Sequence, residues 1–190
     1  MKLTVASSPH IRGDFKSSRI MLDVILALLP ATAWAVYAFG FKALLLVVVS
    51  VVACVFWEWL YRVLMKKPQT IGDLSAVVTG MLLAFVSPVT VPYWMIVIGA
   101  FFAIVLVKQL YGGIGCNFLN PALGGRAFLM ASYPVFMTTW ARVRTALPLF
   151  GTPADVVTGA TPLAFMKEGN LPDVSMADAA LGMIGGCIGE

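Results

Sequence analysis

The stretch KALLLVVVSVVACVFWEWLYRVLM, residues 42–65, decides the fold class of this chain. Between Lys42 and Arg62 the only charged side chain is that of Glu58. Coiled as an α-helix, the stretch would be about 36 Å long, which exceeds the roughly 30 Å hydrocarbon core of a bilayer. We therefore predict a transmembrane helix here.

The rest of the chain continues this pattern. Hydrophobic residues make up 60% of the sequence and charged residues only 12%, which is far from the average soluble protein. Ile20–Phe39 and Tyr93–Val107 are predicted to be two further transmembrane helices. Two shorter apolar stretches are Leu74–Val86 and Ala122–Met137, the second interrupted by Pro134. They are predicted to be either half-spanning helices, whose ends other protein must cover, or ordinary short spans.

Asp178–Glu190 is predicted to begin one more helix. Its apolar part has about ten positions, too few to cross a bilayer. Its glycines, at 182 and 186 and again at 185 and 189, have the spacing that lets membrane helices pack closely. We therefore expect an N-terminal fragment of an all-α polytopic membrane protein, with about five transmembrane or half-spanning helices and the start of a sixth.

Basic residues flank the predicted spans asymmetrically. Several precede the first span and follow the second, whereas only Lys42 lies between these two. The positive-inside rule then makes the N-terminus cytoplasmic and the loop after the fifth helix external. The chain divides into a cytoplasmic segment 1–19, a transmembrane bundle 20–137, an outer loop 138–175 and the start of the next part, 176–190. The net charge of +4 belongs to these flanking residues, so no nucleic-acid partner is expected.

The outer loop contains the segment DVVTGATPL, residues 155–163. Gly159 and Ala160 are small enough for a bulky group to approach the backbone beside the hydroxyl of Thr161. The proline that follows fixes the chain just after this hydroxyl. Taken alone, the same string is also compatible with an ordinary loop turn.

This segment resembles the flavinylation signature of a membrane redox family. The family comprises the RnfD subunits of the Rnf ferredoxin:NAD oxidoreductases and the homologous NqrB subunits of the Na+-pumping NADH:quinone reductases. The resemblance implies that Thr161 carries FMN through a phosphoester bond, with Asp155, Thr158, Gly159 and Ala160 forming the signature around it. It also implies a bundle of two inverted repeats, of which this chain is the first repeat and the beginning of the second.

A second motif, GGIGCNFLNPA at residues 112–122, precedes the fifth helix. The amide of Asn120, followed by Pro121, is typical of a helix start, so a purely structural role as a cap is one interpretation. The string also resembles the Gly-Gly-x-Gly-x-Asn-x-x-Asn-Pro-Ala segment of the same family. That resemblance implies that Asn117 and Asn120 lie near a non-covalently bound riboflavin.

Together the two resemblances imply a membrane electron-transfer subunit, not catalytic alone, in a ferredoxin:NAD oxidoreductase that couples electron transfer to Na+ or H+ translocation. Its expected partners are the other subunits of the complex, including iron–sulfur and flavin subunits, membrane lipid, and a flavin transferase for maturation. Its expected location is the bacterial or archaeal cytoplasmic membrane, with Thr161 on the outer face. Three alternatives stay open: the NqrB subunit of the quinone reductases, a urea-channel-like pore, and a scaffold without cofactor.

Four carboxylates lie in or beside the predicted spans, where ionisable groups are costly. Asp178 is expected to start the last helix, where its charge suits the helix dipole. Asp23 is a candidate for an ion path, or else forms an ion pair with Arg19 four positions earlier. Glu58 is expected at the inner membrane interface, within an aromatic belt. Asp73 is expected to cap the short helix that follows it. The three cysteines are far apart in the sequence, so neither an iron–sulfur nor a zinc site is expected from this chain alone.

Overall fold

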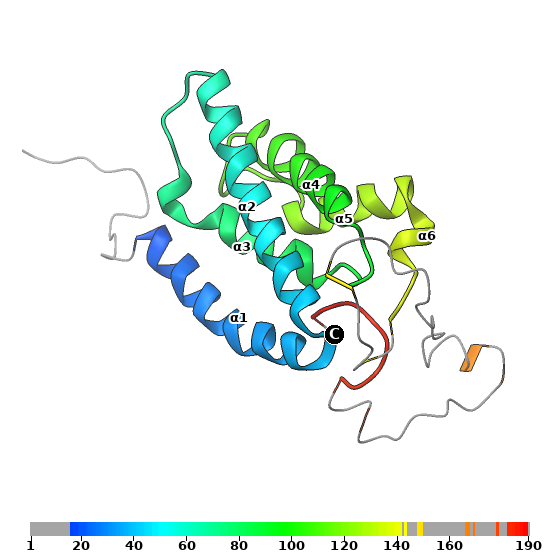
Figure 1. Ribbon diagram of the computed structural model, residues 1–190. Coiled ribbons are helices and arrows are strands. Elements are labelled where there is room, and N and C mark those ends of the chain that lie inside the picture. The colour runs from blue at the N-terminus through cyan, green and yellow to red at the C-terminus, as the bar shows by residue number, and fades with distance from the viewer. Residues whose placement is uncertain are drawn as a thin grey trace, which may run out of the picture.

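The computed structural model describes residues 16–141, 143, 148–149, 166–167, 169, 178 and 182–189. The regular elements of these residues are all helices (Figure 1). In chain order they are α1 (Ser17–Phe39), α2 (Phe41–Leu64), the 3-10 helix η1 (Ile71–Asp73), α3 (Ser75–Phe85), α4 (Tyr93–Phe101), the π-helix η2 (Phe102–Gln109), α5 (Pro121–Ser132) and α6 (Pro134–Met137). The predicted all-α fold is confirmed for this part of the chain.

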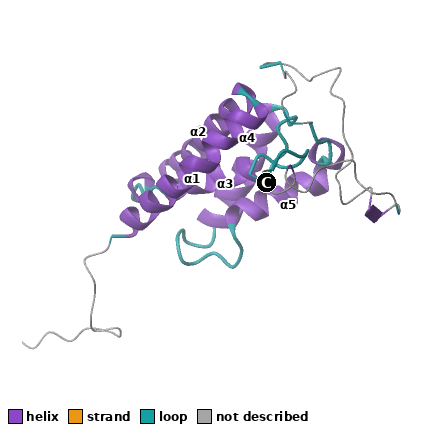
Figure 2. Cartoon of the chain, turned by 90° about the horizontal axis from the view of Figure 1, so that it is seen from below, coloured by secondary structure: helices purple, strands orange, loops and turns teal. Residues whose placement is uncertain are grey.

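The first two helices, α1 and α2, form a hairpin with one residue between them (Figures 1 and 2). That residue is Gly40, whose φ of +76° lies in a region open to glycine without steric penalty. The two helices have 23 and 24 residues and are long and apolar enough to cross a membrane. They correspond to the first two predicted spans. The buried residues of α1 begin only at Thr32, so α1 lies at the edge of the bundle.

The central helix is α2, which packs against α1, α3, α4 and η2. Its closest neighbour is α3, because Gly80 lets the two backbones meet. A Cβ atom added at Gly80 would lie only 2.6 Å from the Cα of Val51. At the same crossing the hydroxyl of Ser50 donates a hydrogen bond of 2.7 Å to the Gly80 carbonyl. The side chain of Trp57 likewise donates from α2 to the Val97 carbonyl on α4, at 3.1 Å.

Helices α3 and α5 are short, as predicted. They have 11 and 12 residues, which corresponds to about 17–18 Å, little more than half of a hydrocarbon core. The structure therefore supports the half-spanning alternative. Helix α5 ends at Ser132, and Tyr133, with φ −136° and ψ 58°, separates it from Pro134. A following proline disfavours the helical conformation in the residue before it.

The third predicted long span is one continuous helix with two parts. The first part, α4, has 9 residues, and the second, η2, is a π-helix of 8 residues that ends at Gln109. Stretches of π-helix are rare and frequently occur at functional sites. In this molecule η2 carries the polar residues Lys108 and Gln109 at its end.

The two ends of the bundle differ in chemistry. At one end, here called the Gly40 end, the α1–α2 turn meets the end of α3 and the start of α4. The apolar core there includes Phe39, Val91 and Ile188. At the other, the Glu58 end, the last turns of α2 meet η1, the start of α3 and the end of η2. Buried polar side chains gather at that end.

Residues 182–189 are not helical, so the helix predicted to run on from Asp178 does not cover them. They lie along the end of α3, where the backbone N–H of Ile188 donates to the Ser87 carbonyl at 3.1 Å. Glycine is the poorest helix former after proline, and four of these eight residues are glycine. The small size of these glycines lets the irregular segment lie close to α3 and to the loop around Ala141.

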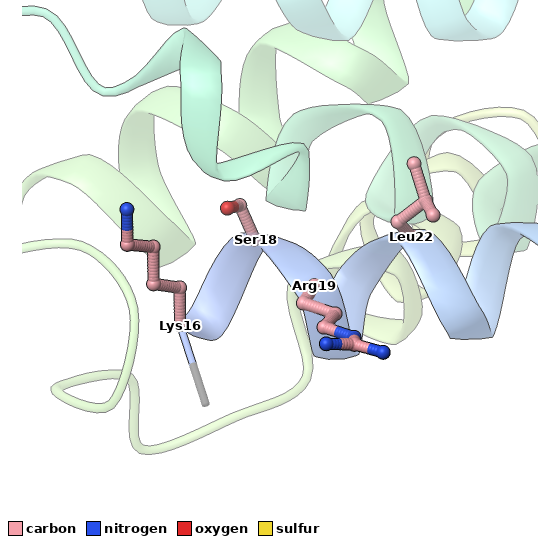
Figure 3. A pocket seen from close by; sticks show the side chains of 4 residues that line it. All are labelled: Lys16, Ser18, Arg19 and Leu22. Carbon is pink, nitrogen blue, oxygen red and sulfur yellow. The ribbon is translucent and has the colours of Figure 1, made fainter. Parts of the chain in front are cut away.

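The predicted ion pair between Arg19 and Asp23 does not form. The one ion pair among the described residues lies elsewhere, and Asp23 is exposed. Arg19 instead lines an open pocket at the start of α1 together with Lys16, Ser18 and Leu22 (Figure 3). An exposed pair at this spacing gains only about 0.3–0.5 kcal/mol, too little to hold two side chains together.

Candidate functional site

The residues predicted to surround the attached FMN lie outside the described part of the chain: Asp155, Thr158, Gly159, Ala160 and Thr161. Two described residues, one before this segment and one after it, lie at the Gly40 end. Before it, the carbonyl of Leu149 accepts a hydrogen bond from the hydroxyl of Tyr93, the first residue of α4. After it, Ile188 packs in the core with Phe39.

Asn120 has the structural role that one interpretation of the sequence gives it. Its Oδ1 accepts a hydrogen bond of 3.0 Å from the backbone N–H of Ala122, which caps α5. Pro121 occupies the first helical position, where its missing N–H leaves nothing unsatisfied. The predicted cap is confirmed, and the acceptor atom of Asn120 is therefore engaged within the protein.

Asn117 differs from Asn120. Its Oδ1 is buried and has no hydrogen-bond partner among the described residues. The loop that presents it turns at Gly112, Gly113 and Gly115, with φ values of +115°, +99° and +82°, which only glycine adopts readily. A buried polar atom without a partner is unusual in a native protein. Asn117 is thus the residue of this loop that has capacity for a ligand.

Aromatic side chains stand beside this loop. The rings of Tyr111 and Phe118 are in edge contact, with centroids 4.8 Å apart. Both are exposed, although burial would favour large apolar rings. On its other side the loop lies against α2, because a Cβ at Gly113 would be 3.2 Å from Nη2 of Arg62. The loop therefore combines an unpaired amide oxygen, two exposed rings and a nearby guanidinium group.

Glu58, expected at the inner membrane interface within an aromatic belt, is fully buried in the protein, with an exposed fraction of 0%. Its Oε2 accepts from the ammonium of Lys108 at 2.8 Å. Its Oε1 accepts from the hydroxyl of Thr70 at 2.6 Å and from the side-chain amide of Gln109 at 2.9 Å. The sequence analysis did not predict this ion pair, because Lys108 lies 50 positions away on another helix, which local patterns do not reveal.

The network continues from Lys108 into α3. The Lys108 ammonium also donates to the hydroxyl of Ser75. Ser75 in turn donates from its backbone N–H and its hydroxyl to Oδ1 of Asp73, at 2.9 Å and 2.6 Å. Asp73 therefore satisfies the first N–H of α3, but the N-cap position that was predicted for it is occupied by Leu74. Through these bonds one buried network ties α2, η1, α3 and η2 together.

The polar network is stabilising only while it is complete. Burial removes much of the hydration of two charges, and only close pairing and additional hydrogen bonds compensate for that cost in free energy. The carboxylate of Glu58 has both an ion-pair partner and further hydrogen bonds. A sequence signal for the pair does exist: Glu58 and Lys108 are isolated charges near the ends of two apolar stretches that finish on the same side of the predicted bundle.

Two helices of spanning length, half-length helices in the same bundle and a buried ion pair are consistent with a polytopic, helical membrane protein. Residues 4–190 match the family described as NQR2, RnfD, RnfE. The match covers nearly all of the sequence, and the chain belongs to this family.

The chain is similar to several curated relatives. The D subunit of the Na(+)-translocating ferredoxin:NAD(+) oxidoreductase complex of Acetobacterium woodii is 50% identical, over 100% of this chain and 58% of that protein. The proton-translocating counterpart of Clostridium ljungdahlii is 44% identical, over 86% of this chain and 48% of that protein. The D subunit of the ion-translocating oxidoreductase complex of Shewanella amazonensis is 44% identical, over 76% of this chain and 42% of that protein. The chain spans about half the length of these relatives.

Proposed function

We propose that this chain belongs to the membrane subunit of an Rnf-type ferredoxin:NAD oxidoreductase and that Thr161 carries FMN through a phosphoester bond. The observation that carries the proposal is the Thr158–Thr161 segment, a flavinylation-like signature in a chain of this family. A bound flavin would supply transfer of one or two electrons. Covalent attachment would retain it on an exposed surface.

The position of the flanking residues agrees with this proposal. Leu149 and Ile188 both lie at the Gly40 end, opposite to the end where α1 begins. If the N-terminus is cytoplasmic, as the basic residues favour, the Gly40 end faces outward. The proposed FMN would then lie on the outer side of the membrane.

We further propose that the loop at 112–122 contacts a non-covalent riboflavin. The buried, unpaired Oδ1 of Asn117 is suited to accept from the imide N–H of a flavin ring. Asn120 would act through the loop, because its own Oδ1 caps α5. The exposed rings of Tyr111 and Phe118 offer apolar faces of the kind against which a flat heterocycle stacks.

The wider role follows from the relatives. Each is named as the D subunit of an ion-translocating oxidoreductase complex, which favours the Rnf branch of the family over the NqrB branch of the quinone reductases. We propose that the whole subunit joins iron–sulfur and flavin subunits in the cytoplasmic membrane and passes electrons in a process coupled to Na+ or H+ movement. A flavin transferase would load the FMN.

The test is fluorescence of the denatured protein in a gel. The complete subunit is co-expressed with a flavin transferase as wild type, as Thr161→Ala and as Thr152→Ala, the last being a matched control in the same loop but outside the signature. We expect a fluorescent band for the wild type and for Thr152→Ala and none for Thr161→Ala. The absence of a band from full-length wild-type protein, with a demonstrably active transferase, would contradict the proposal and favour a pore or a scaffold.

A further inference from the structure

Lys42 is a buried lysine with no counter-charge among the described residues. It is the second residue of α2, and only 3% of it is exposed. Its Nζ is buried and has no hydrogen-bond partner among the described residues. The ion pair that the same part of the chain contains joins Lys108 and Glu58, at the opposite end of the bundle. The membrane segment of α2 thus begins with an ammonium group that nothing described here neutralises.

The position of Lys42 within its helix makes this more costly. The first turn of a helix carries partial positive charge from its free N–H groups, so a cation there is unfavourable. In α2 the first turn has no acidic residue, and Gly40 provides no side-chain cap. Helical side chains generally lean toward the N-terminus of their helix, which for Lys42 is the first turn of α2. The end of α1, one residue before α2, contributes partial negative charge to the same region, but it contributes no acidic side chain.

This combination has the chemistry of an anion site. The N-terminus of a long helix offers several N–H donors to an oxyanion, and a lysine adds a full positive charge. An isolated buried ammonium is unfavourable unless it is paired. The arrangement therefore favours a negatively charged group with several acceptor oxygens, bound next to the first turn of α2.

The surroundings of Lys42 indicate where such a group would come from. Leu149 lies beside Phe41, the first residue of α2, in a shallow apolar depression. Ile188 belongs to the same apolar cluster as Phe39 and Ala43. Leu149 and Ile188, which precede and follow the segment that contains Thr161, thus both lie at the Gly40 end of the bundle.

We propose that Lys42 and the first turn of α2 bind a phosphate group at the Gly40 end of the bundle. The first source of this phosphate is the phosphoester of FMN on Thr161, an assignment that rests on the function proposed above. The same chemistry is present in the headgroup of a phospholipid, which the experiment must distinguish.

The experiment is a double-variant cycle on the complete subunit, co-expressed with flavin transferase and purified in neutral detergent. Lys42→Met removes the charge but keeps the length of the side chain, and Thr161→Ala removes the flavin phosphate. Melting temperatures are measured for the wild type, both single variants and the double variant. Lys42→Arg, which keeps the charge, and Lys66→Met, which removes an exposed charge, serve as controls.

For the flavin phosphate, we expect Lys42→Met to lower the Tm of the flavinylated protein by about 2–4 °C and to raise the Tm of Thr161→Ala protein by a similar amount. Lys42→Arg should behave as wild type, and Lys66→Met should have the same small effect in both backgrounds. A change of sign between the two backgrounds, confined to Lys42→Met, supports the flavin as source.

The lipid source is tested by repeating the series in nanodiscs of phosphatidylglycerol. If Lys42→Met lowers the Tm there in both backgrounds but not in neutral detergent, the bound phosphate belongs to a lipid. An equal effect of Lys42→Met in both backgrounds and both media overturns the proposal, because Lys42 would then be neutralised by the protein itself. If the wild type carries no covalent flavin, the function proposed above fails, and the nanodisc series alone decides the phosphate site.

Discussion

The buried ion pair at the Glu58 end gives a sharp prediction. In Lys108→Met the Oε1 of Glu58 keeps its two donors, Thr70 at 2.6 Å and Gln109 at 2.9 Å. Its Oε2, however, loses the only donor that the described residues provide, the Lys108 ammonium at 2.8 Å. The variant therefore leaves a buried carboxylate, with 0% exposure, in which one of the two oxygens has no hydrogen-bond donor.

The magnitude follows from this geometry. Removal of one partner from a buried ion pair destabilises a protein by about 3–5 kcal/mol. Because two of the three donors to Glu58 remain, we expect a value near the lower limit, about 3 kcal/mol. In Glu58→Gln/Lys108→Met no charge is left unpaired, so the loss should fall to about 1–2 kcal/mol, the scale of one or two neutral hydrogen bonds.

The assay is unfolding by increasing amounts of SDS in mixed micelles, followed by the fluorescence of the five tryptophans of the sequence. Lys66→Met is the matched control, because Lys66 is exposed near the same end and its loss should change stability by less than about 0.5 kcal/mol. If Lys108→Met lies within about 1 kcal/mol of wild type, or if the double variant is as unstable as Lys108→Met, the pair does not have the role described.

Two more predictions concern glycine and asparagine. Gly80→Ala places a Cβ 2.6 Å from the backbone of Val51, so we expect loss of folded protein in detergent size-exclusion chromatography, whereas Gly72→Ala, with nothing within 4 Å, should elute as wild type. Asn120→Ala removes the cap of α5 and should cost about 1 kcal/mol in the SDS titration. Asn117→Ala should leave stability within about 0.5 kcal/mol but reduce the flavin released on denaturation; unchanged release would remove Asn117 from the proposed riboflavin site.

Much of the architecture could be predicted because it depends on local properties of the chain. Apolar length identifies α1 and α2 as helices that can span a bilayer. The break at Pro134 follows from the ring of proline and its effect on the preceding residue. Helix caps are equally local, since an asparagine or aspartate side chain reaches a backbone N–H two residues later. For this reason the cap that Asn120 forms on α5 was predictable, as was a bond from Asp73 to the start of α3.

The failures of prediction share a different cause. Glycine spacing at 182–189 is compatible both with helix packing and with an irregular, closely packed segment, and only contact with the end of α3 decides between them. The ion pair expected between Arg19 and Asp23 has the correct spacing but too little energy to fix exposed side chains. Neither outcome can be obtained from spacing alone.

The sequence by itself determined the fold class, the positions of the helices and their breaks, and the family to which the chain belongs, since each rests on composition, spacing or a contiguous motif. Only the tertiary structure decided which charges meet. It joined Glu58 to Lys108, left Lys42 without a described partner, and separated the engaged amide of Asn120 from the unpaired one of Asn117. The physical reason is that burial and pairing depend on neighbours from distant parts of the chain, and in a low-dielectric interior these neighbours determine the cost of each charge.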